Sequence, residues 1–154
     1  MNVSLAFPPH PVWVRPAREV VRALLAASGH PELTDTAVLL TSETVTNAIN
    51  ACAAKGCTTS VILHAAWLRP ARLRILVHDE ATGLPTARSA APDDEGGRGL
   101  RLIAFGAHAW GVDTVDSGRG KATWFELGAG ASRAALTPAR PAPSIGVPTW
   151  TGPS

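Results

Sequence analysis

The stretch RLRILVHD, residues 72–79, ends on an acidic residue, Asp79. Its apolar middle, which includes the β-branched Ile75 and Val77, favours a β-strand. Asp79 closes this run and opens a segment, residues 80–98, that is rich in Gly, Pro, Ala and acidic residues. An irregular segment of that length inside a small domain is more often functional than idle. The sequence therefore predicts a strand that delivers one carboxylate to the start of a functional loop.

The residues before this strand predict another strand and two helices. The stretch TSVILHAAW, residues 59–67, predicts a neighbouring strand, which the turn LRPA separates from the first. An amphipathic helix is expected to have Pro16 near its first turn and Gly29 just past its end. A second helix is expected to begin within residues 31–34 and to end before Gly56. The apolar stripes of the two helices are Ala17, Val20, Val21, Leu24 and Leu25 on the first, and Val38, Thr41, Val45, Ala48 and Cys52 on the second.

The rest of the domain predicts one more helix and a hairpin. A short helix is expected over residues 99–109, and strands at 109–116 and 122–127 flank a Gly-rich turn. The run VSLAF, residues 3–7, is stopped by two prolines and predicts an edge strand or an ordered arm. This order of elements favours an α+β two-layer sandwich, with a mixed, mostly antiparallel sheet and the helices on one face.

The composition shifts at residue 128. Residues 128–154 contain five prolines and no acidic residue, which is typical of a disordered tail. The folded domain is therefore expected to cover residues 3–127. Within it, Trp67, Trp110 and Trp124 are expected to pack in the core.

Charge and cysteine content narrow the class of protein. The net charge is only +2 and no block of Lys and Arg stands out, so direct nucleic-acid binding is disfavoured. Cys52 and Cys57 have no second cysteine pair with which to form a zinc site, and they are interpreted as reduced thiols. The N-terminus has no secretion signal and no segment is apolar enough to span a membrane, so we expect a cytoplasmic protein.

Glu43 and Asn47 are four residues apart on the second helix, about 40° apart around its axis. A solvated polar face would explain both residues, but the apolar residues around them favour partial burial. A carboxamide oxygen can bind Mg²⁺, and a carboxylate can orient or deprotonate a hydroxyl group. The pair is therefore a candidate for catalysis as well as for an ordinary helix surface.

Asp79 and Gly83 are candidates for the recognition of a planar ligand. A carboxylate at the end of a strand can accept a hydrogen bond from an exocyclic amine, such as that of adenine. Gly83 would let the backbone approach a flat base, because it has no side chain. An ordinary turn that begins with Asp remains the alternative.

The segment GGRGL, residues 96–100, stands just before the short helix. Helix N-termini present free N–H groups, and glycines let those groups approach phosphate oxygens. Gly97, Arg98, Gly99 and Leu100 therefore form a candidate anion site, with a plain hinge as the alternative. Near the end of the domain, Lys121 could reach a phosphate, although a lone lysine at a strand start is ordinarily solvated.

Four segments occur here in a characteristic order: SETVTNA on a helix, VHDEATG after a strand, GGRGL before a helix and GKATWFEL on the last strand. In this combination the sequence resembles the histidine-kinase-like ATPase (GHKL, Bergerat-fold) superfamily. It is most similar to the single-domain serine kinases that act as anti-sigma factors. The resemblance covers residues 15–127 and implies ATP, bound with Mg²⁺ under a mobile lid.

The resemblance also implies roles for individual residues. Asn47 matches the position that binds Mg²⁺, and Glu43 matches the position proposed as the general base. Asp79 matches the acceptor of the adenine amine and Gly83 the glycine that lines the base. The other implied ATP-binding residues are Gly97, Arg98, Gly99 and Leu100 at the phosphate end of the lid, and Lys121 and Thr123 in the last segment, where Thr123 supports adenine recognition.

Two departures from the family pattern bear on activity. Relatives usually carry a His-Gly pair where this chain has residues 50–52, Asn-Ala-Cys, and usually a glycine where it has Ala81. The leading hypothesis is a serine/threonine kinase that phosphorylates an anti-anti-sigma (STAS-type) protein and binds a sigma factor, with homodimer formation left open. A non-catalytic ATP-binding switch is the second hypothesis, and a nucleic-acid accessory protein is the third.

Overall fold

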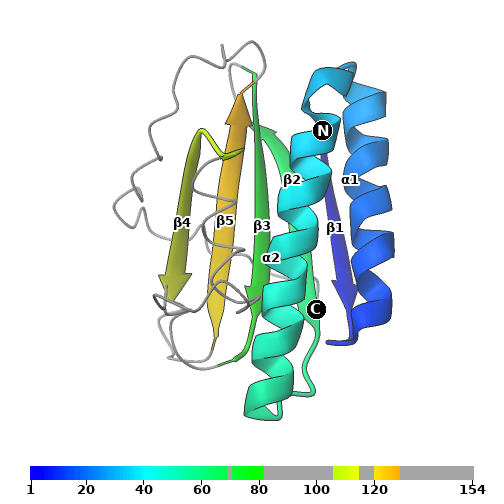
Figure 1. Ribbon diagram of the computed structural model, residues 1–154. Helices are drawn as coiled ribbons and strands as arrows, with labels where there is room; N and C mark the ends of the chain where they lie inside the picture. The colour runs from blue at the N-terminus through cyan, green and yellow to red at the C-terminus, as the bar shows by residue number, and fades with distance from the viewer. Residues whose placement is uncertain (69–70, 82–105, 115–119, 129–154) are drawn as a thin grey trace.

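The computed structural model describes residues 1–68, 71–81, 106–114 and 120–128. In these residues two helices cover one face of an antiparallel sheet, which confirms the predicted α+β sandwich (Figure 1). The strands are ordered β1-β2-β3-β5-β4 across the sheet. In chain order the elements are β1 (Asn2–Phe7), the 3₁₀ turn η1 (Pro11–Trp13), α1 (Val14–Ser28), the 3₁₀ turn η2 (Pro31–Leu33), α2 (Thr34–Lys55), β2 (Val61–Leu68), β3 (Arg72–Asp79), β4 (Ala109–Thr114) and β5 (Lys121–Gly128).

Both helices stop where the sequence indicated. Gly29 follows α1 with φ 75° and Gly56 follows α2 with φ 68°, a left-handed conformation that glycine adopts without steric penalty. The predicted stripe of α2 is buried in full, and that of α1 is buried except for the partly exposed Val20. α1 begins two residues before Pro16, because the 3₁₀ turn η1 leads directly into it.

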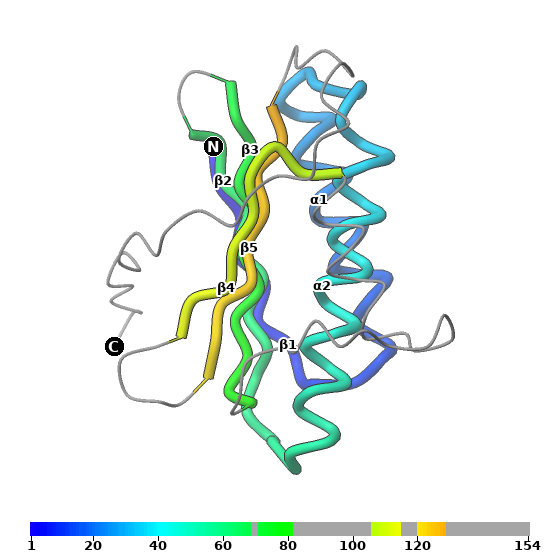
Figure 2. The backbone as a smooth tube through the Cα atoms, turned by 60° about the vertical axis from the view of Figure 1, so that its left-hand side comes forward, coloured from blue at the N-terminus to red at the C-terminus, as the bar shows by residue number. Residues whose placement is uncertain are grey.

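The hydrophobic core lies between the helices and the sheet. In β3 the residues Leu73, Ile75, Val77 and Asp79 are buried and alternate with partly exposed ones, so alternate side chains point toward the helices. Figure 2 shows the sheet almost edge-on, with α1 and α2 together on one side of it. Among the described elements, α1 packs against β1, while α2 packs mainly against β3 and also against β2. None of the described helices is long and apolar enough to cross a membrane.

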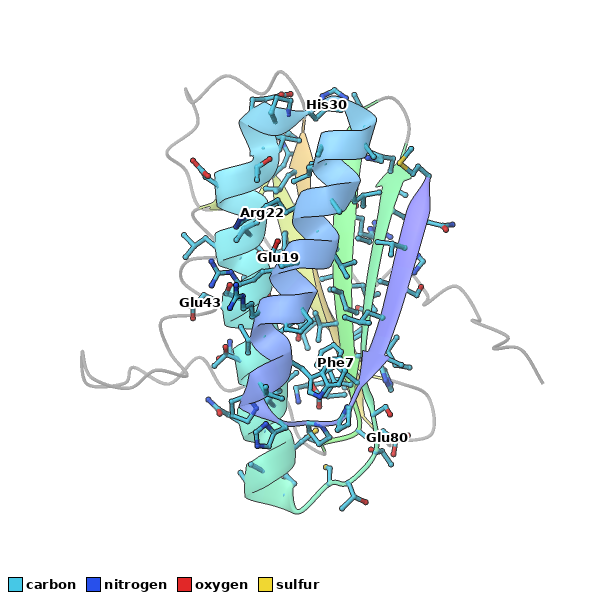
Figure 3. The ribbon with its side chains drawn as sticks, turned by 90° about the vertical axis from the view of Figure 1, so that its right-hand side faces the viewer. Phe7, Glu19, Arg22, His30, Glu43 and Glu80 are labelled. Carbon is cyan, nitrogen blue, oxygen red and sulfur yellow. The ribbon has the colours of Figure 1, made fainter. Side chains whose placement is uncertain are left out.

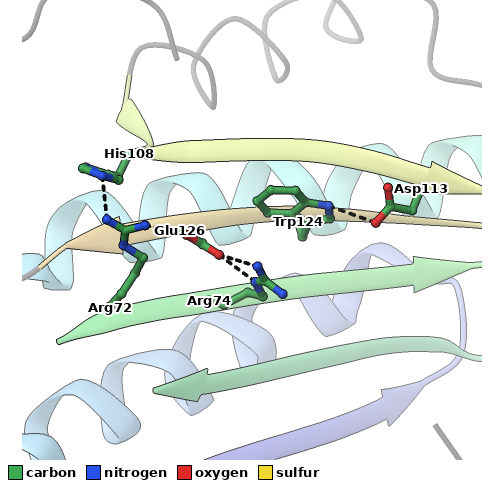
Figure 4. Close-up of polar contacts among 6 residues, drawn as sticks. All are labelled: Arg72, Arg74, His108, Asp113, Trp124 and Glu126. Atoms are coloured by element: carbon green, nitrogen blue, oxygen red, sulfur yellow. Dashed lines mark hydrogen bonds and ion pairs between the residues drawn. The ribbon is translucent and has the colours of Figure 1, made fainter. Parts of the chain in front are cut away.

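The other face of the sheet carries a polar network. Glu126 accepts hydrogen bonds from the side chains of Arg72 (Nη1–Oε2, 3.2 Å) and Arg74 (Nε–Oε1, 2.9 Å). The guanidinium group of Arg74 also lies over the Trp124 ring, 4.9 Å from its centroid. Figure 4 shows this network in front of the sheet, with the helices behind. Glu126 is thus buried with two cationic partners, which compensates its removal from water.

Trp124 corrects one expectation about the core. Trp67 and Trp110 pack against the core as expected, but Trp124 lies on the opposite face of the sheet. Its indole N–H donates to Asp113 (3.2 Å), and its ring covers Gly111, where a Cβ would come within 2.7 Å of the indole. The reason is the two-residue period of a strand: Phe125 faces the helices, so its neighbour Trp124 faces away.

Two expectations concern residues that the structure does not describe. The short helix at 99–109 lies outside the described residues except for its last four positions, and there the prediction is wrong at its end: Gly106 is helical, but Ala107 and His108 are not, and Ala109 is the first residue of β4. The disordered tail also lies outside them from residue 129 on, and Gly128 is the last residue of β5.

Candidate functional site

Three elements reach the same end of the molecule. β3 ends there, β5 begins there, and α2 runs toward the same end along β3 (Figure 1). This arrangement follows from the antiparallel pairing of β3 with β5, in which Asp79 is the direct partner of Lys121. Cross-strand partners point to the same face of a sheet, so both side chains point toward the helix layer.

Asp79 and Lys121 form a buried ion pair at this end. Asp79 is 1% exposed and Lys121 is 6% exposed, and the Lys121 Nζ atom lies 2.8 Å from the Asp79 Oδ1 atom. The backbone N–H of Ala81 donates to the same oxygen, at 3.0 Å. Lys121 is therefore not solvated, contrary to the ordinary expectation for a lysine at a strand start. The pair leaves a carboxylate that is ionised, oriented and shielded from water.

Gly120 lets the two strands meet this closely. Its φ is 100°, and a Cβ at this position would lie 2.3 Å from the backbone oxygen of Asp79 and 3.0 Å from the Glu80 Cα. Heavy atoms do not approach backbone atoms so closely without displacing them. Gly120 is therefore required both by its own conformation and by the backbone of Asp79.

A substitution can test this role of Gly120. We expect Gly120→Ala to lower the free energy of unfolding by more than about 2 kcal/mol, because left-handed strain adds to a clash with backbone. Gly29→Ala is the matched control: Gly29 also has positive φ (75°), but a Cβ there would meet nothing within 4 Å. The control should cost only about 1 kcal/mol. Urea unfolding of both variants measures the difference, and equal losses would contradict the proposed backbone contact.

Thr123 lies on the same face of the sheet as Asp79. It is partly exposed and is the cross-strand partner of Val77, which stands two residues before Asp79. The diagonal neighbour of Asp79 on this face is therefore a hydroxyl-bearing side chain. A hydroxyl group can donate and accept, so Thr123 could complement a carboxylate that only accepts.

Glu43 and Asn47 occupy one stripe of α2. Both are partly exposed, one turn apart, and Glu43 extends from the side of α2 that faces away from α1 (Figure 3). The same stripe continues toward the helix start through Leu40 and Thr36, at the i, i+4, i+7, i+11 spacing of one helix face. A Cβ at Gly106 would lie 3.3 Å from Leu40 and 3.6 Å from Thr36. The chain that enters β4 therefore packs against the same stripe that carries Glu43 and Asn47.

The last turn of α2 brings Cys52 toward the Asp79–Lys121 pair. The backbone N–H groups of Gly56 and Cys57 donate to Ala53 and Cys52, which closes the helix end. The pKa of the Cys52 thiol is raised to about 11, mainly by burial and also by the nearby Cys57 thiol and Asp79 carboxylate. Cys52 is therefore a protonated, unreactive thiol that fills the space beside the pair.

Ala81 shows how the structure accommodates one departure from the family pattern. Among the described residues, no residue other than glycine has positive φ, so Ala81 carries no left-handed strain. Its side chain is buried in the core and its N–H donates to Asp79. Alanine at this position is thus compatible with an oriented Asp79 carboxylate.

The phosphate end of the predicted site lies outside the described residues. This applies to Gly97, Arg98, Gly99 and Leu100, and Gly83, predicted to line the base, lies outside them as well. The structure thus places the two predicted residues of α2 on one stripe, and it places Asp79, Lys121 and Thr123 together on the sheet. The pairing of Lys121 with Asp79 escaped sequence reasoning, because the two residues are 42 positions apart.

The described residues fit a nucleotide with its metal ion. A buried, ionised acceptor suits an exocyclic amine, and a partly exposed carboxamide on the neighbouring helix suits Mg²⁺, which takes few protein ligands when phosphates and water supply the rest. Among the described residues, no three His, Cys, Asp or Glu side chains come together to hold a metal ion on their own. The fold and the site together suit a nucleotide-binding α+β domain.

The comparisons with known proteins identify which class of domain this is. Residues 7–125 match the family described as "Histidine kinase-like ATPase domain". The match covers most of the 154 residues, and the chain belongs to this family. Membership supports ATP as the nucleotide. Among curated proteins, none matches the sequence.

Proposed function

We propose that this chain is an ATP-dependent serine/threonine protein kinase of the anti-sigma-factor type. Its substrate would be a serine of an anti-anti-sigma (STAS-type) protein, and a sigma factor would be its second partner, so that phosphorylation controls transcription. The observation that carries the proposal is the stripe of α2 on which Glu43 and Asn47 lie one turn apart and partly exposed. The proposal includes a cytoplasmic location, which the free thiols of Cys52 and Cys57 favour.

The side chains can be assigned to the needs of phosphoryl transfer. This reaction depends on positioning and on stabilisation of charge, and it needs little covalent chemistry from the protein. Asp79 would hold the base, and the Asn47 carboxamide oxygen would help to hold Mg²⁺, which neutralises phosphate charge when bound. Glu43 would accept the proton of the attacking serine hydroxyl. A helix that is packed against the sheet holds Glu43 and Asn47 in a constant relation to Asp79.

Transfer of labelled phosphate tests the kinase proposal directly. The chain is incubated with γ-labelled ATP, Mg²⁺ and the STAS-type proteins that co-purify with it. We expect label on a serine of one of these proteins, and removal of Mg²⁺ with a chelator should abolish the signal. ATP binding without label on any co-purified protein would contradict the kinase proposal.

ATP binding has its own test in thermal unfolding. At 100 times its dissociation constant, ATP with Mg²⁺ should stabilise the fold by ~2.7 kcal/mol, because it binds only the native state. This should appear as a clear rise in melting temperature, with tripolyphosphate and Mg²⁺ as the control for unspecific anion binding. If excess ATP leaves the melting temperature unchanged, the chain is not an ATP-binding protein in solution.

A second candidate function is a non-catalytic switch that binds ATP and presents a nucleotide-ordered lid to a partner. Two observations favour it. The hydrogen bonds that orient Asp79 come from Ala81 and Lys121 and do not involve Glu43, and residues 50–52 depart from the family pattern. A switch should bind its partner more tightly with ATP than without it, and should return the ATP unhydrolysed. Partner pull-down with ATP and with no nucleotide measures this, and label on the partner would exclude it.

A further inference from the structure

Lys121 is the buried cation at the end of the sheet where Asp79 lies, and it is 6% exposed. We propose that Lys121 is a positioning residue for base recognition. It holds Asp79 as a fixed acceptor and so makes the site select a purine with a 6-amino group over one with a 6-oxo group. This inference rests on the proposed ATP binding and adds to it the device that selects the base.

Hydrogen bonds fix the orientation of the Asp79 carboxylate. Two donors converge on the Oδ1 atom: the Lys121 ammonium group at 2.8 Å and the Ala81 N–H at 3.0 Å. One donor belongs to the neighbouring strand β5, and the other belongs to the backbone two residues after Asp79. Together they fix the plane of the carboxylate and hence the direction in which its other oxygen points.

The ion pair with Lys121 decides which kind of base the Asp79 carboxylate can accept. A carboxylate that is removed from water is unfavourable unless a cation accompanies it, and Lys121 is the cation within hydrogen-bonding distance among the described residues. An ionised carboxylate can only accept, whereas a protonated one can also donate. A 6-amino group donates and a 6-oxo group accepts. A carboxylate that is kept ionised therefore rejects the 6-oxo base, which would face it with an acceptor.

The place of Lys121 argues against a direct role on phosphate. Its ammonium group is engaged with the carboxylate that would receive the base, and the 6-position of a purine lies at the far side from the sugar. Gly120 contributes by bringing the backbone of β5 against that of Asp79, so the lysine starts at the base end. A phosphate ligand would have to draw the ammonium group away from a buried partner.

The test compares bases and phosphates in Lys121→Met. The ligands are ATP, inosine triphosphate, which has a 6-oxo group, and adenosine, which has no phosphate, each titrated by calorimetry or ligand-observed NMR. We expect affinity for ATP and adenosine to fall by the same factor, about 10-fold, since a hydrogen bond to a charged group is weakened. The preference for ATP over inosine triphosphate should fall by about 10-fold or more. Lys55→Met, an exposed lysine of α2, is the matched control and should change neither quantity.

Each result decides the inference. A loss for ATP with adenosine unchanged would show a phosphate contact, and an unchanged base preference would show that Lys121 serves the fold alone; either overturns the proposal. If Lys121→Met does not fold, Lys121→Gln keeps a donor without the charge, and it should lose base preference in the same way. If the wild-type chain binds no ATP, the proposed function itself fails. If the wild-type chain binds ATP and Lys121→Met binds the three ligands equally well, only the role of Lys121 fails.

Discussion

Asp79→Asn should lower the free energy of unfolding by about 3–5 kcal/mol, because it leaves the Lys121 ammonium group buried without a counter-charge. For a domain of this size we expect the melting temperature to fall by roughly 10 °C or more. Sequence reasoning alone would have treated Asp79 as a ligand-binding residue that the fold can spare. The structure makes it a part of the fold as well.

The double variant Asp79→Asn with Lys121→Met separates the two roles of Asp79. It replaces the ion pair with a neutral pair of similar size, so we expect it to recover most of the lost stability. It should still bind ATP at least about 10-fold more weakly than the wild type, because the charged acceptor is gone. Glu80→Gln is the control: this neighbouring acid is exposed, and its loss should change stability by less than about 0.5 kcal/mol. A melting temperature for Asp79→Asn equal to that of the wild type would show that the ion pair contributes nothing to the fold.

Glu43→Gln should slow phosphate transfer to the partner by about 10²- to 10⁴-fold, the usual contribution of a general base. ATP affinity should stay within a few-fold of the wild type, because the substitution changes neither Asn47 nor the base end. The fold should also be retained, since Glu43 is partly exposed and glutamine has almost the same shape. Single-turnover transfer from labelled ATP measures the rate, and calorimetry measures the affinity.

A second exposed glutamate provides the control for this experiment. Glu19 lies on α1 within 3.9 Å of Arg22, and Figure 3 shows it on a different helix from Glu43. Glu19→Gln should transfer phosphate at the wild-type rate. If Glu43→Gln also transfers at that rate, Glu43 is not the base, and the α2 stripe serves nucleotide binding alone.

Local pattern was enough to predict most of the fold. The stop signals at Gly29 and Gly56 and the apolar stripe of α2 depend on neighbours within a few residues, and the structure agrees with them. The strand at 72–79 was predicted at its observed bounds for the same reason. Trp124 is buried, as expected, but on the face of the sheet away from the helices, because its register beside Phe125, and not its residue type, decides the face.

The sequence by itself determined the two-layer class of the fold, the points where α1 and α2 end and the residue types available for a site. These properties arise from periodicity and from the backbone preferences of single residues. Only the tertiary structure decided that Asp79 meets Lys121, that Gly120 must lack a side chain, and that Glu43 shares its stripe with the contacts of Gly106. Those contacts join residues far apart in the chain, and they depend on which strands pair and in what register. Pairing is set by the packing of the whole sheet against its helices, which no single segment encodes.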